Sequence, residues 1–260
     1  MSSDRTQREK SATAALGNAD YRWAEFDAEA YFQHYYGEPH PDDDQVVRCA
    51  VAAMKLALPD GNALEVIDVG TGPNLIPLFC AMPRAAWEYA PSNIAWLKAE
   101  LARGDMRPQW QHSWRVTREA YLPEYVLPEN PLPVLRAKTD VLQGSIFELL
   151  ERRWDAATMF FCAEAITGRQ DEFEAACAAY ARCVKQGGML AAAFLVGTRY
   201  VIADRQFPIL CLSPESIERH VRASRDRHKG RENWHRRSGG PKRLFRFCVP
   251  DRNRTLTSRR

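Results

Sequence analysis

The chain has 260 residues, 45% of them hydrophobic, and its 36 basic and 33 acidic side chains leave a formal net charge of +3. This length suits one large α/β domain, and the apolar content is ample for a folded core. The charge balance is too even to indicate a nucleic-acid-binding protein, and no run approaches the ~20 apolar residues that span a bilayer.

The N-terminal segment and the cysteines bear on location. Residues 1–10 are polar and charged and lack the apolar core of a signal peptide. Seven cysteines occur without a CxxC pair, which argues against a disulfide framework and against a zinc site. We therefore expect a cytoplasmic protein with reduced thiols and no metal, and disorder over residues 1–20.

Two helices are expected before the first strand. Asp27 suits the N-cap of a helix over 27–36, in which Tyr31, Tyr35 and Tyr36 cluster on one side. A second helix over 42–58 has acidic residues at its start and apolar residues at helical spacing.

From residue 63 onward, strands alternate with helices. The expected strands are 63–69, 86–88, one ending at Asp140, 156–162 and 189–196, with a turn at 185–188. The expected helices are 74–82, 92–101 capped by Ser92, 110–121, 172–184 and one starting at Ser213. This alternation predicts a doubly wound, mostly parallel sheet.

The first strand leads directly into a glycine turn, Gly70-Thr71-Gly72, which allows a ligand to approach the backbone closely. Glu88 follows Asp68 by 20 residues, the spacing of an acid that holds two ribose hydroxyls. Leu75 replaces the third glycine of a dinucleotide site, and no Lys-Ser/Thr follows for a P-loop. An adenosyl ligand without phosphates needs neither feature. The alternative is a glycine turn without ligand and a Glu88 that merely ends a strand.

Residues 24–222 resemble the nicotinamide, phenylethanolamine and indolethylamine N-methyltransferases. The tyrosines upstream of the Gly-Thr-Gly-Pro turn are the specific part of this resemblance. The matching segments, in the family's order, are Phe26, Tyr31–Tyr36, Ile67–Pro73, Glu88–Asn93, Lys138–Val141, Asp155–Ala165, Lys185–Gly188 and Tyr200–Phe207.

The resemblance implies a seven-stranded class I methyltransferase sheet of Rossmann-like type. It also implies a helical cap at 21–60 that closes over S-adenosylmethionine and a cofactor-binding core at 61–222. The expected reaction transfers a methyl group to a small-molecule acceptor and leaves S-adenosylhomocysteine. We expect a monomer without nucleic-acid or membrane partners.

The resemblance also assigns roles to residues. Glu88 and Tyr89 would hold the ribose, Asp140 and Val141 would flank the adenine, and Tyr36 would approach the cofactor carboxylate. The whole expected cofactor set is Tyr31, Tyr36, Asp68, Gly70, Thr71, Gly72, Glu88, Tyr89, Asn93, Asp140, Val141, Phe160 and Cys162.

Glu164 and Tyr31 are the expected catalytic residues, with Glu164 binding an amine or acting as base. The carboxylate that orients nicotinamide in the family is missing in Ala192–Phe194, which predicts another acceptor. A neutral amine or ring nitrogen needs no strong base, whereas a hydroxyl would need one such as Glu164 or His34. O-methylation of a specialised metabolite and cofactor binding without catalysis remain alternatives.

Residues 223–260 form a basic C-terminal tail that departs from the expected final strands. A nucleic-acid-binding arm and a disordered charged tail are two interpretations. A third is a frameshift in the gene, because Asp226–Asn253 can be encoded by DNA that yields a strand, a turn and a strand in the next frame. We favour the frameshift, and we rank a nucleic-acid methyltransferase guided by the tail last among the functions.

Overall fold

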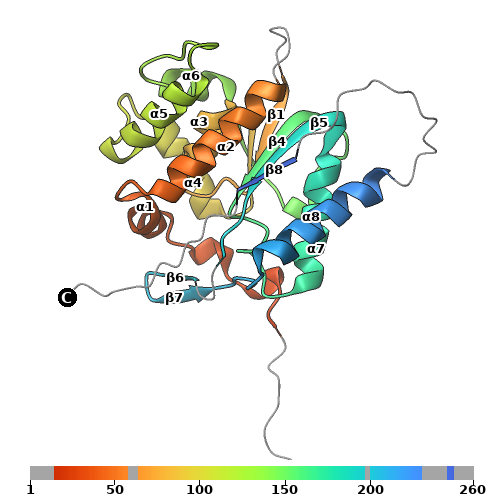
Figure 1. Ribbon diagram of the computed structural model, residues 1–260. Helices are drawn as coiled ribbons and strands as arrows, with labels where there is room; N and C mark the ends of the chain where they lie inside the picture. The colour runs from red at the N-terminus through yellow and green to blue at the C-terminus, as the bar shows by residue number, and fades with distance from the viewer. Residues whose placement is uncertain (1–14, 58–63, 197–199, 230–244, 249–260) are drawn as a thin grey trace, which may run out of the picture.

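The computed structural model describes residues 15–57, 64–196, 200–229 and 245–248. Figure 1 shows a central sheet with helices on both faces. Its strand order is β3-β2-β1-β4-β5-β8, and every neighbouring pair is parallel. The strands are β1 Val66–Val69, β2 Ala85–Glu88, β3 Asp140–Gln143, β4 Trp154–Phe160, β5 Val184–Ala193 and β8 Phe245–Cys248.

A separate antiparallel hairpin consists of β6, Tyr200–Ile202, and β7, Arg205–Phe207. Three short 3-10 helices are η1 Asn18–Asp20, η2 Trp23–Glu25 and η3 Ile146–Glu148. The α-helices are α1 Ala28–Tyr36, α2 Pro41–Ala57, α3 Ile76–Ala81, α4 Pro91–Leu101, α5 Pro108–Tyr121, α6 Leu132–Lys138, α7 Gln170–Cys183 and α8 Pro214–Lys229. None of the described helices is long and apolar enough to cross a membrane.

The core has two layers because successive residues of a strand point to opposite faces of the sheet. On β1, Val66 packs with α2 to α6, whereas Ile67 packs with α7 and α8. On β5, Ala191 packs in the same layer as Val66, and Leu190 packs in the same layer as Ile67. Both faces of the central strands are buried, which explains their continuous apolar runs. Figure 1 shows the two helical layers on either side of the sheet.

The parallel α/β sheet predicted from the alternation is confirmed, but its edge differs from the expectation of seven strands. Six strands of the main sheet lie within the described residues, and β8 pairs with β5 in parallel. Most of the basic tail lies outside the described residues. Inside it, Ala223–Lys229 continues α8.

Several local predictions were wrong. Pro91 begins α4 and Ala90 is its N-cap, so Ser92 lies inside the helix. Asp140 begins β3 instead of ending a strand. The expected turn at 185–188 is a bulge within β5, where the register shifts. Asn18–Asp20 is a 3-10 helix although disorder was expected there, and residues 1–14 lie outside the described residues.

Candidate functional site

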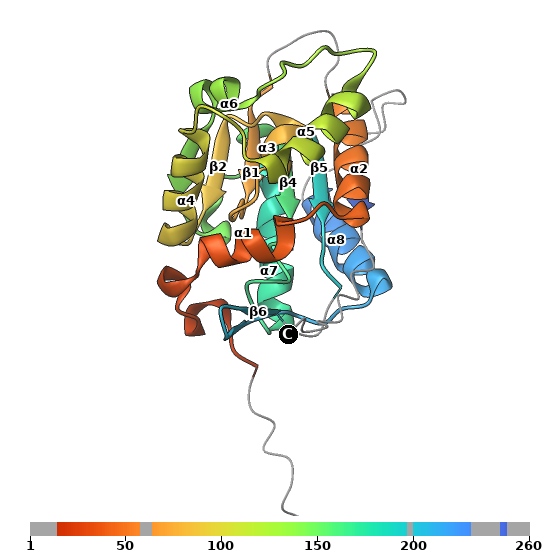
Figure 2. The ribbon, with the colours of Figure 1, turned by 90° about the vertical axis from the view of Figure 1, so that its left-hand side faces the viewer.

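A cavity opens at the carboxyl ends of β1, β2, β3 and β4, where an open parallel sheet binds its ligands. Figure 2 shows α1 lying across this end of the sheet, close to the β6–β7 hairpin. The lining residues are Asn18, Trp23, Phe26, Tyr31, Gly70–Asn74, Trp87–Ala90, Asn93, Gly144–Ile146, Phe160–Cys162, Ala165 and Ile166. We call Gly70–Asn74 and Glu88 the floor of the cavity, and Asn18, Trp23, Phe26 and Tyr31 its roof.

The floor turn requires glycine at two positions. Gly70 has a φ of +69°, and a Cβ there would lie 2.2 Å from the Sγ of Cys162. Gly72 has a φ of +60°, and the nearest atom to its would-be Cβ is the Gly70 oxygen at 4.0 Å. The backbone at Gly72 therefore borders open space, which a ligand can occupy at close range.

Glu88 is the polar centre of the floor. Its Oε1 accepts hydrogen bonds from the backbone N–H groups of Tyr89 at 2.9 Å and Ala90 at 2.8 Å, and from Asn93 Nδ2 at 3.3 Å. Its Oε2 accepts from Gly72 N at 2.8 Å. Burial raises the pKa of Glu88, although these donors act in the opposite direction. The carboxylate thus joins the ends of β1 and β2, and it fixes the floor turn.

Asp68 lies beneath the floor and does not line the cavity. Its side chain is completely buried, and its Oδ1 accepts a hydrogen bond from the Thr158 hydroxyl at 2.5 Å. Burial raises the pKa of Asp68 to about 7. This position supports β1 against β4, so the structure does not bring Asp68 to a ligand.

The residues that follow β3 form a side wall of the cavity. Trp87 Nε1 donates to the Ser145 carbonyl at 3.0 Å, and a Cβ at Gly144 would lie 2.0 Å from the Trp87 ring. Trp87 lines the cavity and offers it an aromatic surface. Gly144 could have indicated this contact from the sequence, because a glycine in or next to a strand often marks a place where another group approaches the backbone closely.

Asp140 and Val141 are not at the cavity, contrary to the expectation that they flank an adenine. Asp140 pairs with Ala85 at the start of β2, and its carboxylate bridges to Arg84 at 3.1 Å. At ~3.3 Å per residue, the start of β3 lies about 13 Å from Gly144. From this part of the chain, Gly144, Ser145 and Ile146 line the cavity instead.

The roof is aromatic. Trp23 packs on Phe207 with ring centroids 5.8 Å apart, and Phe26 packs on Tyr31 at 5.5 Å. Tyr36, expected to reach the cofactor, packs instead against Trp110 at 5.2 Å and does not line the cavity. Tyr36 follows Tyr31 by five residues, which corresponds to a net rotation of about 140° around the helix axis, so α1 presents Tyr31 to the cavity and Tyr36 to the core.

Glu164, expected to be catalytic, is not among the residues that line the cavity. Its neighbours Phe161 and Cys162 line the cavity, but its own carboxylate is fully buried. Oε1 accepts from Leu195 N at 2.6 Å, and burial raises the pKa of Glu164 to about 7. The side chain therefore ties the loop after β4 to the end of β5.

The cavity fits an adenosyl ligand by its donors and its shape. Asn93 Oδ1 is buried beside Glu88 and has no hydrogen-bond partner among the described residues. Among the described residues, Glu88 Oε2 accepts one hydrogen bond, from Gly72 N, and can accept another from a hydroxyl group. Trp87 offers an aromatic surface, and Gly72 leaves the backbone open. No group of His, Cys, Asp and Glu side chains that could hold a metal occurs in the described part of the chain.

A parallel α/β sheet with a Gly-x-Gly turn and an acid at the end of the second strand matches the core of a class I methyltransferase. The profile of the NNMT/PNMT/TEMT family matches residues 14–227. The chain belongs to this family of S-adenosylmethionine-dependent methyltransferases of small molecules. No curated protein matches the sequence significantly.

Solved structures show a distant likeness. The DhpI complex with S-adenosylhomocysteine has a TM-score of 0.47 and 16% identity, with 76% of this chain and 81% of that chain covered. The Burkholderia thailandensis 1,6-didemethyltoxoflavin-N1-methyltransferase has a TM-score of 0.38 and 17% identity, with 70% and 68% covered. The cyclase SpnF has a TM-score of 0.42 and 14% identity, with 70% of this chain but 57% of that chain covered.

Proposed function

We propose that the cavity binds S-adenosylmethionine on its floor and transfers the methyl group to an uncharged nitrogen of a small aromatic acceptor. The single observation that supports an uncharged acceptor is the charge of the side chains that line the cavity. Among the described lining residues, Glu88 is the only charged side chain, and backbone donors already surround it.

A nitrogen lone pair can attack the methyl carbon without first losing a proton, whereas a hydroxyl needs a base within hydrogen-bond reach. Glu164, the expected base, faces Leu195 instead. The roof and Phe161 supply flat apolar surfaces on which an aromatic ring stacks. The bound cofactor supplies an activated methyl on a cationic sulfur, and nearby aromatic faces favour such a cation.

In this proposal, residues 21–60 act as the cap and 61–222 as the catalytic core. Glu88 and Asn93 hold the ribose, Trp87 and Ser145 border the adenine, and Gly70 to Gly72 border the amino-acid end. Tyr31 orients the acceptor from the roof, and Cys162 with Phe160 borders the methyl. The protein works as a monomer in the cytoplasm, and the oligomeric state is checked by size-exclusion chromatography with light scattering.

The experiment compares three acceptors of one shape: isoquinoline, 2-naphthylamine and 2-naphthol, each with radiolabelled S-adenosylmethionine at pH 8. We expect methylation of one or both nitrogen compounds and none of the naphthol. Faster methylation of 2-naphthol would contradict the proposal and support O-methylation. Binding of S-adenosylhomocysteine without any turnover across a wider set of amines and azaheterocycles would support the non-catalytic alternative.

A further inference from the structure

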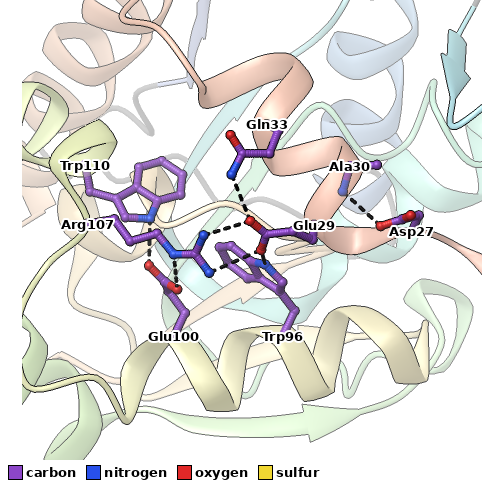
Figure 3. A network of polar contacts seen from close by, with 8 residues as sticks. All are labelled: Asp27, Glu29, Ala30, Gln33, Trp96, Glu100, Arg107 and Trp110. Atoms are coloured by element: carbon purple, nitrogen blue, oxygen red, sulfur yellow. Dashed lines mark hydrogen bonds and ion pairs between the residues drawn. The ribbon is translucent and has the colours of Figure 1, made fainter.

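Arg107 lies outside the cavity, yet it connects the helix that carries Tyr31 to the core. It is the N-cap residue of α5, and its carbonyl accepts the backbone N–H of Trp110 at 3.0 Å. Figure 3 shows its guanidinium between two carboxylates, Glu29 of α1 and Glu100 of α4. The three side chains form what we call the Arg107 bridge.

On the α1 side, the bridge is a two-pronged contact. Arg107 donates from Nη1 to Glu29 Oε1 at 2.8 Å and from Nη2 to Oε2 at 3.1 Å. Gln33 Nε2 and Trp96 Nε1 each donate to the same carboxylate at 2.8 Å (Figure 3). A planar fork on a carboxylate fixes orientation as well as distance. Partial burial acts to raise the pKa of Glu29, but these donors outweigh it and bring the pKa to about 2.

On the core side, the bridge is buried. Arg107 Nε donates to Glu100 Oε2 at 2.8 Å, and Trp110 Nε1 donates to Glu100 Oε1 at 3.1 Å. The side chain of Glu100 is only 2% exposed, and these two donors compensate for the burial of its carboxyl oxygens. Arg107 is therefore tied to α4 and α5 through Glu100. The guanidinium also lies 4.8 Å from the ring centroid of Phe32, a buried residue of α1, and this cation–π contact is a further link between Arg107 and α1.

The bridge acts on the face of α1 that is opposite the cavity. Glu29 and Gln33 are four residues apart and share one face, as do Tyr31 and Tyr35 on the other. Two residues along a helix correspond to a rotation of about 200°, so Glu29 and Tyr31 point in nearly opposite directions. Any rotation of α1 that moved Tyr31 out of the cavity wall would pull Glu29 away from Arg107.

We propose that Arg107 is a positioning residue of the site, which through Glu29 holds α1 closed over the cavity and keeps Tyr31 in its wall. The inference rests on the proposed function for its consequence, since a closed α1 retains the bound cofactor. The contact between Glu29 and Arg107 is the one that opens, because Glu29 is 47% exposed and Glu100 is not. Release of the product then requires the opening of this contact.

The test uses Glu29→Ala, which removes the α1 half of the bridge and leaves Arg107, Glu100 and Trp110 in place. The first measurement is amide hydrogen exchange of the full chain without ligand. We expect exchange over Tyr31–Tyr36 to accelerate about tenfold, while α4 and α5 exchange as before. The second measurement is the dissociation rate of S-adenosylhomocysteine, which we expect to rise about tenfold.

The matched control is Glu119→Ala, which removes an exposed carboxylate that pairs with Arg115 at 3.0 Å on α5. It is expected to leave both rates unchanged. Arg107→Lys keeps the charge but not the fork, and it is expected to give an intermediate exchange rate.

Unchanged exchange of α1 in Glu29→Ala would overturn the proposal, as would equal acceleration in α1, α4 and α5. Failure of the unaltered chain to bind S-adenosylhomocysteine would contradict the proposed function instead. In that case the exchange rates of the ligand-free protein still decide whether the bridge holds α1.

Discussion

The floor and the roof of the cavity are built in different ways. The floor consists of strand ends and a glycine turn, and its one carboxylate is buried and bonded to backbone N–H groups. The roof comes from the N-terminal segment and is fastened by side chains at the surface. Asn18 N donates to Glu172 at 2.7 Å, and Glu25 pairs with Arg205.

This difference indicates a division of labour. Backbone hydrogen bonds between parallel strands cannot rearrange without disturbing the sheet, so the floor is set before a ligand arrives. Exposed ion pairs contribute roughly 0–1 kcal/mol each and can open individually. We therefore expect changes in the floor to abolish cofactor binding, and changes in the roof or behind the cavity to have smaller and more specific effects.

The largest effect is expected for Glu88→Ala. The change leaves the N–H groups of Gly72, Tyr89 and Ala90 without their acceptor and removes the ribose partner. We expect the dissociation constant for S-adenosylhomocysteine to rise at least about 100-fold in calorimetry, which corresponds to about 2.7 kcal/mol.

Its matched control is Glu65→Ala, an exposed carboxylate paired with Arg153 at 3.2 Å, which is expected to leave affinity within about twofold. Circular dichroism verifies folding, and Glu88→Gln replaces the alanine variant if that does not fold. Equal affinity in the unaltered chain and a folded Glu88 variant would remove Glu88 from the cofactor site.

Gly70→Ala is expected to have the next largest effect, on stability. A side chain there meets a left-handed φ of +69° and lies 2.2 Å from Cys162 Sγ. The backbone strain costs about 1 kcal/mol and overpacking a further 1–3 kcal/mol, so the free energy of unfolding should fall by about 2–4 kcal/mol. Urea unfolding measures this. Gly104→Ala is the control because no atom lies within 4 Å of its Cβ, and similar losses in both variants would contradict the geometry.

The smallest effect on binding is expected for Glu164→Gln. The folded protein keeps this proton up to a pKa of about 7, whereas the unfolded chain releases it near the ordinary value of 4.5. Between these values the folded state binds more protons, so the free energy of unfolding falls as pH rises, by up to about 1.4 kcal/mol per pH unit. The glutamine variant should lose this part of the slope, while Asp68, with a similar pKa, retains its own.

Urea unfolding from pH 5 to pH 8 measures the slope for both proteins. Affinity for S-adenosylhomocysteine should stay within about twofold, since the carboxylate faces Leu195. A variant with normal cofactor affinity but no turnover would return Glu164 to the catalytic residues and contradict its placement behind the cavity.

Sequencing the gene tests the frameshift that we propose for the C-terminal tail. The family match ends at residue 227, directly after Asp226, where the proposed frameshift begins. The frameshift predicts that the gene can be read in a second frame that encodes a strand, a turn and a strand from this point. Codons incompatible with that frame would rule it out.

Predictions from the sequence succeeded where the determinant was local. Gly70, Thr71, Gly72 and Glu88 were placed at the cavity because a strand, a glycine turn and a second strand follow one another along the chain. Asp27 was expected as an N-cap, and its Oδ1 accepts from Ala30 N at 2.9 Å. Such features depend on a few neighbouring residues and their backbone angles.

Predictions failed where two distant segments had to be aligned. Asp140 was assigned to the cavity from a motif, but the pairing of β3 with β2 places Ser145 there instead. Tyr36 and Glu164 lie within the expected segments and point into the core. The direction of a side chain depends on the rotation of its helix or the path of its loop, which packing decides.

By itself the sequence determined the parallel α/β architecture, the adenosyl-type glycine turn and the family. Hydrophobic period and turn chemistry carry that information locally. Only the tertiary structure decided which acids reach the cavity, which aromatic rings form its roof, and that Arg107 joins α1 to α4. Glu29 and Arg107 are 78 residues apart, and their contact exists because the burial of Phe32 against Trp110 brings α1 onto the core.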